Sequence, residues 1–207
     1  MLPKSADAVI IGGGIVGCAA AFYLAKAGVR ALLLERGHLA GEASGESAGV
    51  LSPPGENDPS HPLFQLALQG ARVYPSLAEE LREETGIDIE HRRIGILMPL
   101  HERDDHEALK GWVGRQRKNG VQVEVLEHQQ ALAAEPSLSN KVQGAIRFSE
   151  TGHVNPRRLV LALAAAAGRH GATIATGCPV HSVIHEHSRI SGVCSGNDVV
   201  STETLVL

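Results

Sequence analysis

Three glycines near the N-terminus have the types and spacing needed to hold a phosphate group. Gly12, Gly14 and Gly17 form a Gly-x-Gly-x-x-Gly pattern directly after the apolar run Val9–Ile11. Gly12 permits a tight turn out of a strand, Gly14 lets the backbone approach a pyrophosphate, and Gly17 lets a helix pack against the strand. The N-terminus of that helix offers free N–H groups and a positive dipole end. The pattern therefore predicts a dinucleotide-binding turn.

A carboxylate farther along the chain completes this pattern. Ala19–Ala27 contains helix-forming residues and no breaker, Gly28 can end that helix, and Ala31–Leu34 is a second apolar run of strand length. Glu35 follows this run. Its distance from Gly17 is close to the spacing of about 20 residues at which dinucleotide-binding proteins carry an acidic residue that binds the ribose hydroxyls. We therefore expect a βαβ unit that binds a dinucleotide.

The uncharged stretch 8–25 allows two other interpretations. It is just long enough to span a membrane, and with Lys4 ahead of it and Cys18 inside it could resemble an export signal with a lipidated cysteine. The stretch holds four glycines and only one leucine, however, and Lys26 follows at once. Neither alternative explains the second strand or Glu35. We therefore expect no integral membrane span.

Composition narrows the class of protein. A chain of 207 residues can bury a sizeable core and form one or two domains, and 43% hydrophobic with 20% charged residues is typical of a soluble globular protein. The net charge of −4 gives no reason to expect nucleic acid or an anionic membrane as a partner. Cys18, Cys178 and Cys194 have neither metal nor redox spacing, so we expect reduced thiols in the cytoplasm and no metal site.

Beyond the βαβ unit, periodicity and turn residues predict an inserted α+β segment. Its expected elements are a turn-rich stretch 52–62, a helix Leu63–Thr85 that Pro75 kinks or splits, a strand Ile94–Met98, a helix Glu102–Lys118, and strands Val121–Leu126 and Ala145–Phe148. The α/β pattern then returns. Its expected elements are a helix Leu159–Ala167 capped by Asn155 and ended by Gly171, a strand Ala172–Ala175, a hairpin of Pro179–Ile184 and Ile190–Cys194, and a strand Thr204–Leu207.

This order predicts an α/β fold of Rossmann type with an α+β insert. We expect residues 1–52 to form the first segment of a nucleotide-binding domain, 53–150 part of an inserted substrate domain, and 151–207 the second, incomplete segment of the first domain.

The segment Gly41–Leu51 changes the expected nucleotide. Its small residues let the backbone approach an extended cofactor, although a flexible surface loop has the same composition. With this segment the chain resembles the D-amino acid oxidase family of FAD-dependent flavoproteins, and within it the N-terminal half of the glycine oxidases. The stretches that carry the resemblance are Ala8–Gly17 with Tyr23–Lys26 and Glu35, Ala43–Ser44 with Ser47–Leu51, Leu77–Leu81 with Thr85–Ile89, and Gly152–Arg157 with Gly171–Ala172 and Pro179–Val183.

The resemblance implies FAD as cofactor and assigns roles by position. The residues so assigned are Ile15 and Val16 at the pyrophosphate turn, Glu35 and Arg36 at the adenosine ribose, Ala43, Ser44, Ser47, Ala48, Gly49 and Val50 on the ribityl and flavin side, and the main chain of Val180 at the adenine. From the residues alone, Val180 is better interpreted as a plain strand residue.

The resemblance also implies an activity. Members of the family oxidise the Cα–N bond of a small amino acid or amine to an imine, and molecular oxygen takes the electrons from the flavin to give peroxide. In proteins of this family, the arginine and tyrosine that bind the substrate carboxylate lie in the C-terminal half of the chain. The catalytic residues are therefore expected outside this chain, which would be a truncated part of such an enzyme. His185 and His187 are better explained by a polar turn than by a metal site. The pairs Arg92–Arg93 and Arg157–Arg158 could attract a substrate carboxylate, but solvated surface pairs explain them better.

Several alternatives stay open at this stage. One is a sarcosine oxidase or a quinone-linked amino acid dehydrogenase of the same fold. Another is an NAD-dependent reductase, although Ala48–Leu51 and the insert argue against it. A further alternative is a non-catalytic nucleotide-binding fragment. Homo-oligomer formation and a role in thiamine biosynthesis are also open.

Overall fold

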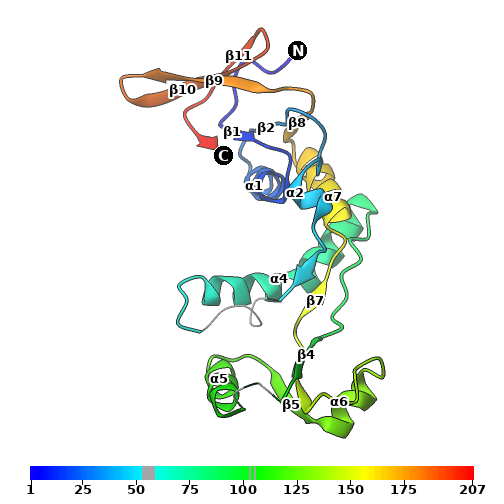
Figure 1. Cartoon of the computed structure of the whole chain (residues 1–207). Coiled ribbons are helices and arrows are strands. Elements are labelled where there is room, and N and C mark those ends of the chain that lie inside the picture. The colour runs from blue at the N-terminus through cyan, green and yellow to red at the C-terminus, as the bar shows by residue number, and fades with distance from the viewer. Residues whose placement is uncertain (53–58, 103, 105) are drawn as a thin grey trace. The chain divides into compact units, whose positions relative to one another are not determined.

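The chain contains two compact units. The structure is a computed structural model that describes residues 1–52, 59–102, 104 and 106–207. Unit 1 comprises Met1–Gly49, Leu77–Glu90 and Asn155–Leu207, and unit 2 comprises Val50–Ser76 and His91–Val154 (Figure 1). The contacts thus place residues 77–90, which we expected in the insert, with unit 1. The division into functional domains stays a prediction.

Unit 1 is built on a parallel sheet with strand order β12-β1-β2-β8. Its strands are β1 (Ala8–Ile11), β2 (Ala31–Leu34), β8 (Thr173–Ala175) and β12 (Leu205–Val206). The residues of β1 and β2 are almost wholly buried, as expected for parallel strands that are covered on both faces. In register, Val9 lies opposite both Leu32 and Leu205. The predicted α/β fold of Rossmann type is confirmed.

Two helices of unit 1 pack against each other, α1 (Ile15–Lys26) and α7 (Pro156–Arg169). The predicted cap of α7 is present, because the side chain of Asn155 accepts a hydrogen bond from the backbone N–H of Arg158 at 3.1 Å. The ring of Phe22 on α1 meets the edge of His170, just after α7, with 5.8 Å between ring centres. These contacts fix α1, and with it the glycine turn that precedes it.

An antiparallel sheet of three strands completes unit 1. It contains β9 (Val180–Glu186), β10 (Arg189–Ser195) and β11 (Asp198–Ser201), drawn in orange to red in Figure 1. The predicted hairpin is confirmed, and its two turn residues, His187 and Ser188, have positive φ angles of 47° and 69°, as the favoured two-residue hairpin turns require. Val193 and Val200 pack in one core cluster with the strands of the parallel sheet.

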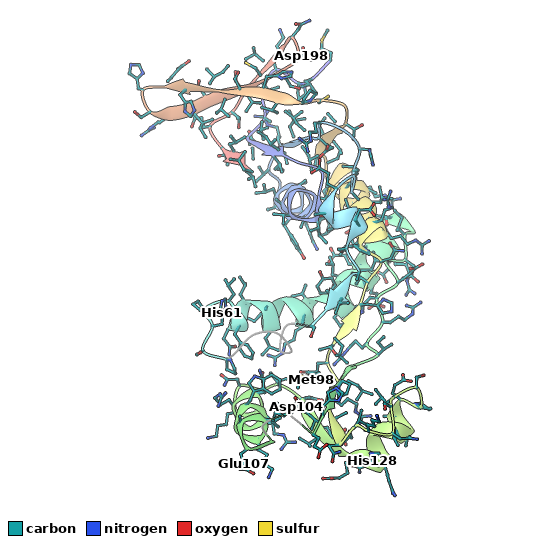
Figure 2. The ribbon with its side chains drawn as sticks, viewed as in Figure 1. His61, Met98, Asp104, Glu107, His128 and Asp198 are labelled. Carbon is teal, nitrogen blue, oxygen red and sulfur yellow. The ribbon has the colours of Figure 1, made fainter. Side chains whose placement is uncertain are left out.

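Unit 2 contains an antiparallel sheet with strand order β4-β6-β5. Its elements are β3 (Val50–Leu51), the first part of α4 (Phe64–Thr85), β4 (Ile96–Leu100), α5 (His106–Lys118), β5 (Val123–Glu127), α6 (His128–Ala134), β6 (Gly144–Phe148) and β7 (Gly152–His153), which pairs with β3. Phe64 and Phe148 are fully buried in its core, and Trp112 meets Phe148 edge to face at 5.7 Å. Figure 2 labels Met98 on β4, which packs against this core.

Several element boundaries differ from the sequence prediction. Pro75 does not split its helix: α4 continues through it, anchored by buried Phe64 and Leu68 before the proline and by buried Leu81 after it. β4 begins at Ile96 rather than Ile94. The helix expected from Glu102 begins at His106. Residues 103 and 105 of that expected helix, and residues 53–58 of the expected turn-rich stretch, lie outside the described residues.

The prediction also missed five short elements: α2 (Ala43–Glu46), β3, α6, β7 and β11. The three strands have two to four residues each and are defined by their pairing partners, which a local sequence pattern does not contain. None of the helices in the described part of the chain has the length and apolar character needed to span a bilayer.

Candidate cofactor-binding site

A cavity of about 480 Å³ opens in unit 1 where β1 and β2 end. Ligands of open α/β sheets bind at these carboxyl ends of the strands. The residues that line the cavity are Ile11, Gly12, Gly13, Gly14, Leu34, Glu35, Arg36, His38, Ala40, Gly41, Glu42, Ala43, Ser44, Cys178, Pro179 and Val180. The cavity thus joins the glycine turn, the end of β2, the loop after it and the start of β9.

The glycine turn leaves no room for side chains at two of its positions. A Cβ atom on Gly17 would lie 2.0 Å from the backbone oxygen of Gly12, and Gly12 itself has a φ of 114°. A Cβ atom on Gly13 would lie 2.7 Å from Leu39 Cδ2 and 2.9 Å from Glu35 Cγ. Backbone, rather than side chain, therefore forms this wall of the cavity, as the close approach of a pyrophosphate requires.

The carboxylate of Glu35 is held by two backbone donors. Oε2 accepts a hydrogen bond from the N–H of Gly13 at 2.6 Å, and Oε1 accepts one from the N–H of Gly37 at 2.6 Å. The backbone of Glu35 is fixed as well, because its N–H donates to Ala175 and its carbonyl accepts from Cys178. Each carboxylate oxygen retains a second lone pair, with which it can accept a hydrogen bond from a ribose hydroxyl.

Ser44 connects the loop after Glu35 with the start of α1. Its Oγ accepts a hydrogen bond from the N–H of Ile15 at 3.0 Å. This N–H belongs to the first turn of the helix, where backbone donors have no partner inside the helix. A Cβ atom on neighbouring Gly45 would lie 1.9 Å from the oxygen of Ala40, so the loop packs tightly here. The N-terminus of α1 therefore faces a polar, closely packed loop.

The glycine pattern and the resemblance assigned a cofactor-binding role to a set of residues, and half of this set lines the cavity. They are Gly12, Gly14, Glu35, Arg36, Ala43, Ser44 and Val180. Within this group, the guanidinium of Arg36 forms an ion pair with Glu42, both side chains being largely exposed.

The other half lie outside the lining. Ile15, Gly17 and the 70% exposed Val16 belong to the first turn of α1. Ser47, Ala48 and Gly49 lie along the loop after α2, and Val50, 57% exposed, belongs to unit 2. Their roles stay predictions.

Sequence reasoning missed several lining residues. Gly13 carries the N–H that holds Glu35, and its position inside the glycine motif could have indicated it. Cys178 and Pro179 directly precede Val180, so the assignment of Val180 could have been extended to them. His38 lies in a loop with no sequence signal for binding.

The thiol next to the site is not a reactive group. Cys18 is fully buried in α1, and this burial, together with the negative charge of Glu35, raises the pKa of its thiol to about 12. Because thiolates rather than thiols are nucleophiles, Cys18 is inert at neutral pH.

The other polar residues singled out from the sequence lie elsewhere. His187 is at the hairpin turn and His185 pairs with Ile190 in β9–β10. Arg157 pairs with Glu46 at 3.3 Å and Arg158 with Glu90 at 2.7 Å. The four side chains are between 43% and 77% exposed, so both ion pairs lie at the surface. Within the described ranges no three potential metal ligands cluster.

The residues present fit a dinucleotide. Backbone N–H groups of the turn and the N-terminus of α1 suit a pyrophosphate, and the fixed carboxylate of Glu35 suits a ribose. Val180 and the two residues before it also line the cavity. This geometry is shared by proteins that bind FAD and proteins that bind NAD, so the choice between the two comes from relatives.

Comparison with known proteins resolves the family. The family model described as FAD dependent oxidoreductase matches residues 7–207. The glycine oxidase of Geobacillus kaustophilus (strain HTA426) is 37% identical over 169 residues, which are 81% of this chain and 45% of that protein. The hydrogen cyanide synthase subunit HcnC of Pseudomonas aeruginosa is 29% identical over 238 residues, covering 98% of this chain and 57% of that protein.

Solved structures agree with this assignment. The crystal structure of the glycine oxidase from Geobacillus kaustophilus superposes with a TM-score of 0.91 at 32% identity, covering 98% of this chain and 55% of that one. The chain thus spans about half the length of the relatives that it matches. With a family model that matches nearly all of it, the chain belongs to the FAD-dependent oxidoreductase family, whose cofactor is FAD.

Proposed function

We propose that this chain forms the FAD-binding part of an enzyme that oxidises the C–N bond of glycine, or of another small amino acid or amine, to the imine, with molecular oxygen as electron acceptor. One observation carries the proposal: the carboxylate of Glu35 is fixed by the N–H groups of Gly13 and Gly37 beside the glycine turn, in a chain whose relatives include glycine oxidases. The family match removes the reason to consider NAD.

The chain's own residues would bind and orient the cofactor. The N–H group of Gly14 and the N-terminus of α1 would bind the pyrophosphate, since the N–H groups of Gly13 and Ile15 already donate to Glu35 and Ser44. Glu35 would accept hydrogen bonds from the adenosine ribose, and the main chain of Val180 would contact the adenine. Ala43 and Ser44, with Ser47, Ala48, Gly49 and Val50, would lie along the ribityl chain and the flavin. When bound, FAD supplies an acceptor for two electrons, and the protein contributes position and electrostatics.

The substrate and the electron acceptor are the least constrained parts of the proposal. The alternatives are a sarcosine oxidase, a quinone-linked amino acid dehydrogenase, and a chain that binds FAD without turnover. For the cellular location we propose the cytoplasm, which agrees with three free cysteines in the described residues. Homo-oligomer formation and a link to thiamine biosynthesis belong to the same proposal.

The test starts with FAD binding by the purified chain. Titration with FAD should quench flavin fluorescence and saturate at one FAD per chain. Oxygen uptake and peroxide release are then measured with glycine, sarcosine and D-alanine, and the same assay is repeated without oxygen in the presence of a soluble quinone.

Each outcome selects one of the alternatives. Peroxide with glycine supports the proposal, peroxide with sarcosine alone favours the sarcosine oxidase, and reduction of the quinone alone favours the dehydrogenase. FAD binding without any turnover is expected if the catalytic residues lie outside this chain, and absence of FAD binding contradicts all of them.

A further inference from the structure

The middle of the glycine turn is held by a residue from the loop after β2. The backbone N–H of Ala40 donates a hydrogen bond to the carbonyl oxygen of Gly13 at 3.0 Å. This oxygen belongs to the peptide unit that joins Gly13 to Gly14, and the same unit carries the N–H of Gly14. In a trans peptide unit the C=O and the N–H point in opposite directions. The bond from Ala40 therefore directs the N–H of Gly14 away from Ala40.

The N–H of Gly14 is the donor that the turn leaves available for a ligand. On one side of it, the N–H of Gly13 donates to Glu35. On the other side, the N–H of Ile15 donates to Ser44. In the described part of the chain no acceptor reaches the N–H of Gly14, and Gly14 lines the cavity. Backbone N–H groups at the start of a helix bind anions, so this donor suits a phosphate oxygen.

The peptide unit between two glycines is easily turned over. Its reversal would require Gly14 to leave its φ of −83° for a positive value, which glycine adopts without steric cost. Reversal exchanges the two polar groups, so that the carbonyl oxygen of Gly13 takes the place of the N–H. A phosphate would then meet a partial negative charge instead of a donor. A bond that keeps this peptide in one orientation therefore preserves the ability of the turn to bind an anion.

Ala40 is itself held in an unusual backbone conformation. Its φ is 55°, in the left-handed region that residues with a Cβ atom rarely adopt, and it is only 1% exposed. On its carbonyl side the chain of α2 packs closely, since a Cβ atom on Gly45 would lie 1.9 Å from the oxygen of Ala40. Such conformations persist where the surrounding structure determines them. The contacts on both sides of Ala40 thus keep its N–H directed at Gly13.

We propose that Ala40 is a positioning residue of the cofactor site, whose N–H keeps the Gly13–Gly14 peptide oriented so that the N–H of Gly14 donates to a phosphate oxygen of FAD. The inference rests on the proposed role of Gly14 in binding the pyrophosphate. It gives a role to the segment between Glu35 and α2, which returns to the glycine turn at Ala40.

The first test uses the uniformly ¹⁵N-labelled wild-type chain, without FAD, and NMR. The amide hydrogen of Ala40 should exchange with solvent at least about tenfold more slowly than an unstructured amide, with and without ligand. ADP, which carries a pyrophosphate but no flavin, should shift the amide signal of Gly14 in a saturable way. Adenosine, which has no phosphate, should leave that signal in place. Rapid exchange at Ala40, or equal shifts of Gly14 with ADP and adenosine, would overturn the proposal.

Two substitutions of Ala40 separate its conformation from its packing. Ala40→Gly keeps the N–H and adopts a positive φ readily, so the Kd for ADP should stay within about twofold of the wild-type value. Ala40→Val resists a positive φ and should move the N–H off Gly13. The Kd for ADP should then rise about tenfold or more, because the lost hydrogen bond is to a charged ligand, whereas the Kd for adenosine should change less than about twofold.

A matched control accounts for the added volume. Ala164→Val adds the same two carbons to a buried alanine of α7, where the backbone is helical, and should change neither Kd. Equal weakening of ADP and adenosine binding by Ala40→Val would indicate a merely structural role and contradict the proposal. An unchanged Kd for ADP in that variant would contradict it as well.

The remaining outcomes separate this inference from the proposed function. The dispersion of the amide spectrum shows whether each variant is folded, and if Ala40→Val unfolds, the measurements on the wild-type chain decide. Absence of FAD binding by the wild-type chain would defeat the proposed function and this inference together. FAD binding with rapid exchange at Ala40, or with normal ADP affinity in folded Ala40→Val, would defeat this inference alone.

Discussion

Two cavities of this chain, one in each unit, are lined by a glutamate, Glu35 and Glu150, and the two carboxylates are held in different ways. In unit 1, both oxygens of Glu35 accept hydrogen bonds from backbone N–H groups at 2.6 Å. In unit 2, Oε1 of Glu150 lies 3.8 Å from Arg93 Nη2, and Oε2 is buried without a hydrogen-bond donor among the described residues. Main-chain donors position the first carboxylate. The second lies beside the half-exposed side chain of Arg93.

This difference shows how a site can be prepared in advance. A carboxylate that backbone donors hold loses little freedom when a ligand arrives, so its hydrogen bonds contribute more fully to affinity. A buried carboxylate oxygen without a donor, as in Glu150, is unfavourable instead. We therefore expect changes in unit 1 to act through the geometry of the backbone and changes in unit 2 to act through packing and charge.

The largest effect is expected in the core of unit 2. Phe148→Ala removes a fully buried ring that meets Trp112, and it should lower the free energy of unfolding of this unit by about 3–5 kcal/mol. Denaturant unfolding followed by the fluorescence of Trp112, the chain's one tryptophan, measures it. FAD binding should be unchanged. A parallel loss of FAD affinity would show that the two units do not act independently.

The next largest effect is expected at the glycine turn. Gly17→Ala places a Cβ atom 2.0 Å from the oxygen of Gly12, so the turn must shift. It should lower the stability of unit 1 by about 3 kcal/mol and abolish measurable FAD binding. Gly168→Ala in α7 is the matched control, because a Cβ atom there meets nothing within 4 Å and should stabilise the helix by about 0.5–1 kcal/mol. Unchanged FAD binding in Gly17→Ala would refute the tight turn.

A smaller effect is expected from the carboxylate of unit 1. Glu35→Gln keeps the shape of the side chain and removes the charge that the N–H groups of Gly13 and Gly37 bind. Hydrogen bonds to a charged group contribute about 1.5–3 kcal/mol, so the Kd for FAD should rise about 10- to 100-fold in a fluorescence titration. Glu42→Gln, in the exposed pair with Arg36, should raise it less than about threefold. Equal effects would make Glu35 an ordinary surface acid.

The smallest effect at neutral pH concerns the thiols of unit 1. Because burial raises the pKa of Cys18 to about 12 from a usual value of 9.0, the folded chain keeps this proton where the unfolded chain has lost it. The contribution to stability is therefore complete below pH 9 and is lost as the pH rises from about 9 to about 12.

A thiol-alkylating reagent tests the burial that raises this pKa. At pH 8 it should modify the partly exposed Cys178 and Cys194 and leave Cys18 unmodified until denaturant is added. Mass spectrometry of the digested chain identifies the modified residue. Modification of Cys18 in the native chain at a rate similar to that of Cys178 would show that α1 opens readily.

The sequence alone predicted the parts of the molecule that local pattern determines. The strands Val9–Ile11 and Ala31–Leu34, the helix between them and the hairpin before Cys194 are confirmed, because long apolar runs, glycines and caps specify them within a few residues. The choice of FAD rather than NAD came from the resemblance of Gly41–Leu51 to a known family, and the family match confirms it. The individual roles of the predicted site residues remain predictions.

Tertiary structure alone decided the rest. The hydrogen bond from Ile15 to Ser44, the two donors to Glu35, the continuation of α4 through Pro75 and the cavity around Glu150 all depend on residues that are distant in sequence or on packing around the element. A sequence pattern records which turns and helices the backbone prefers. It does not record which side chains meet across the fold, because those contacts form only when the elements pack.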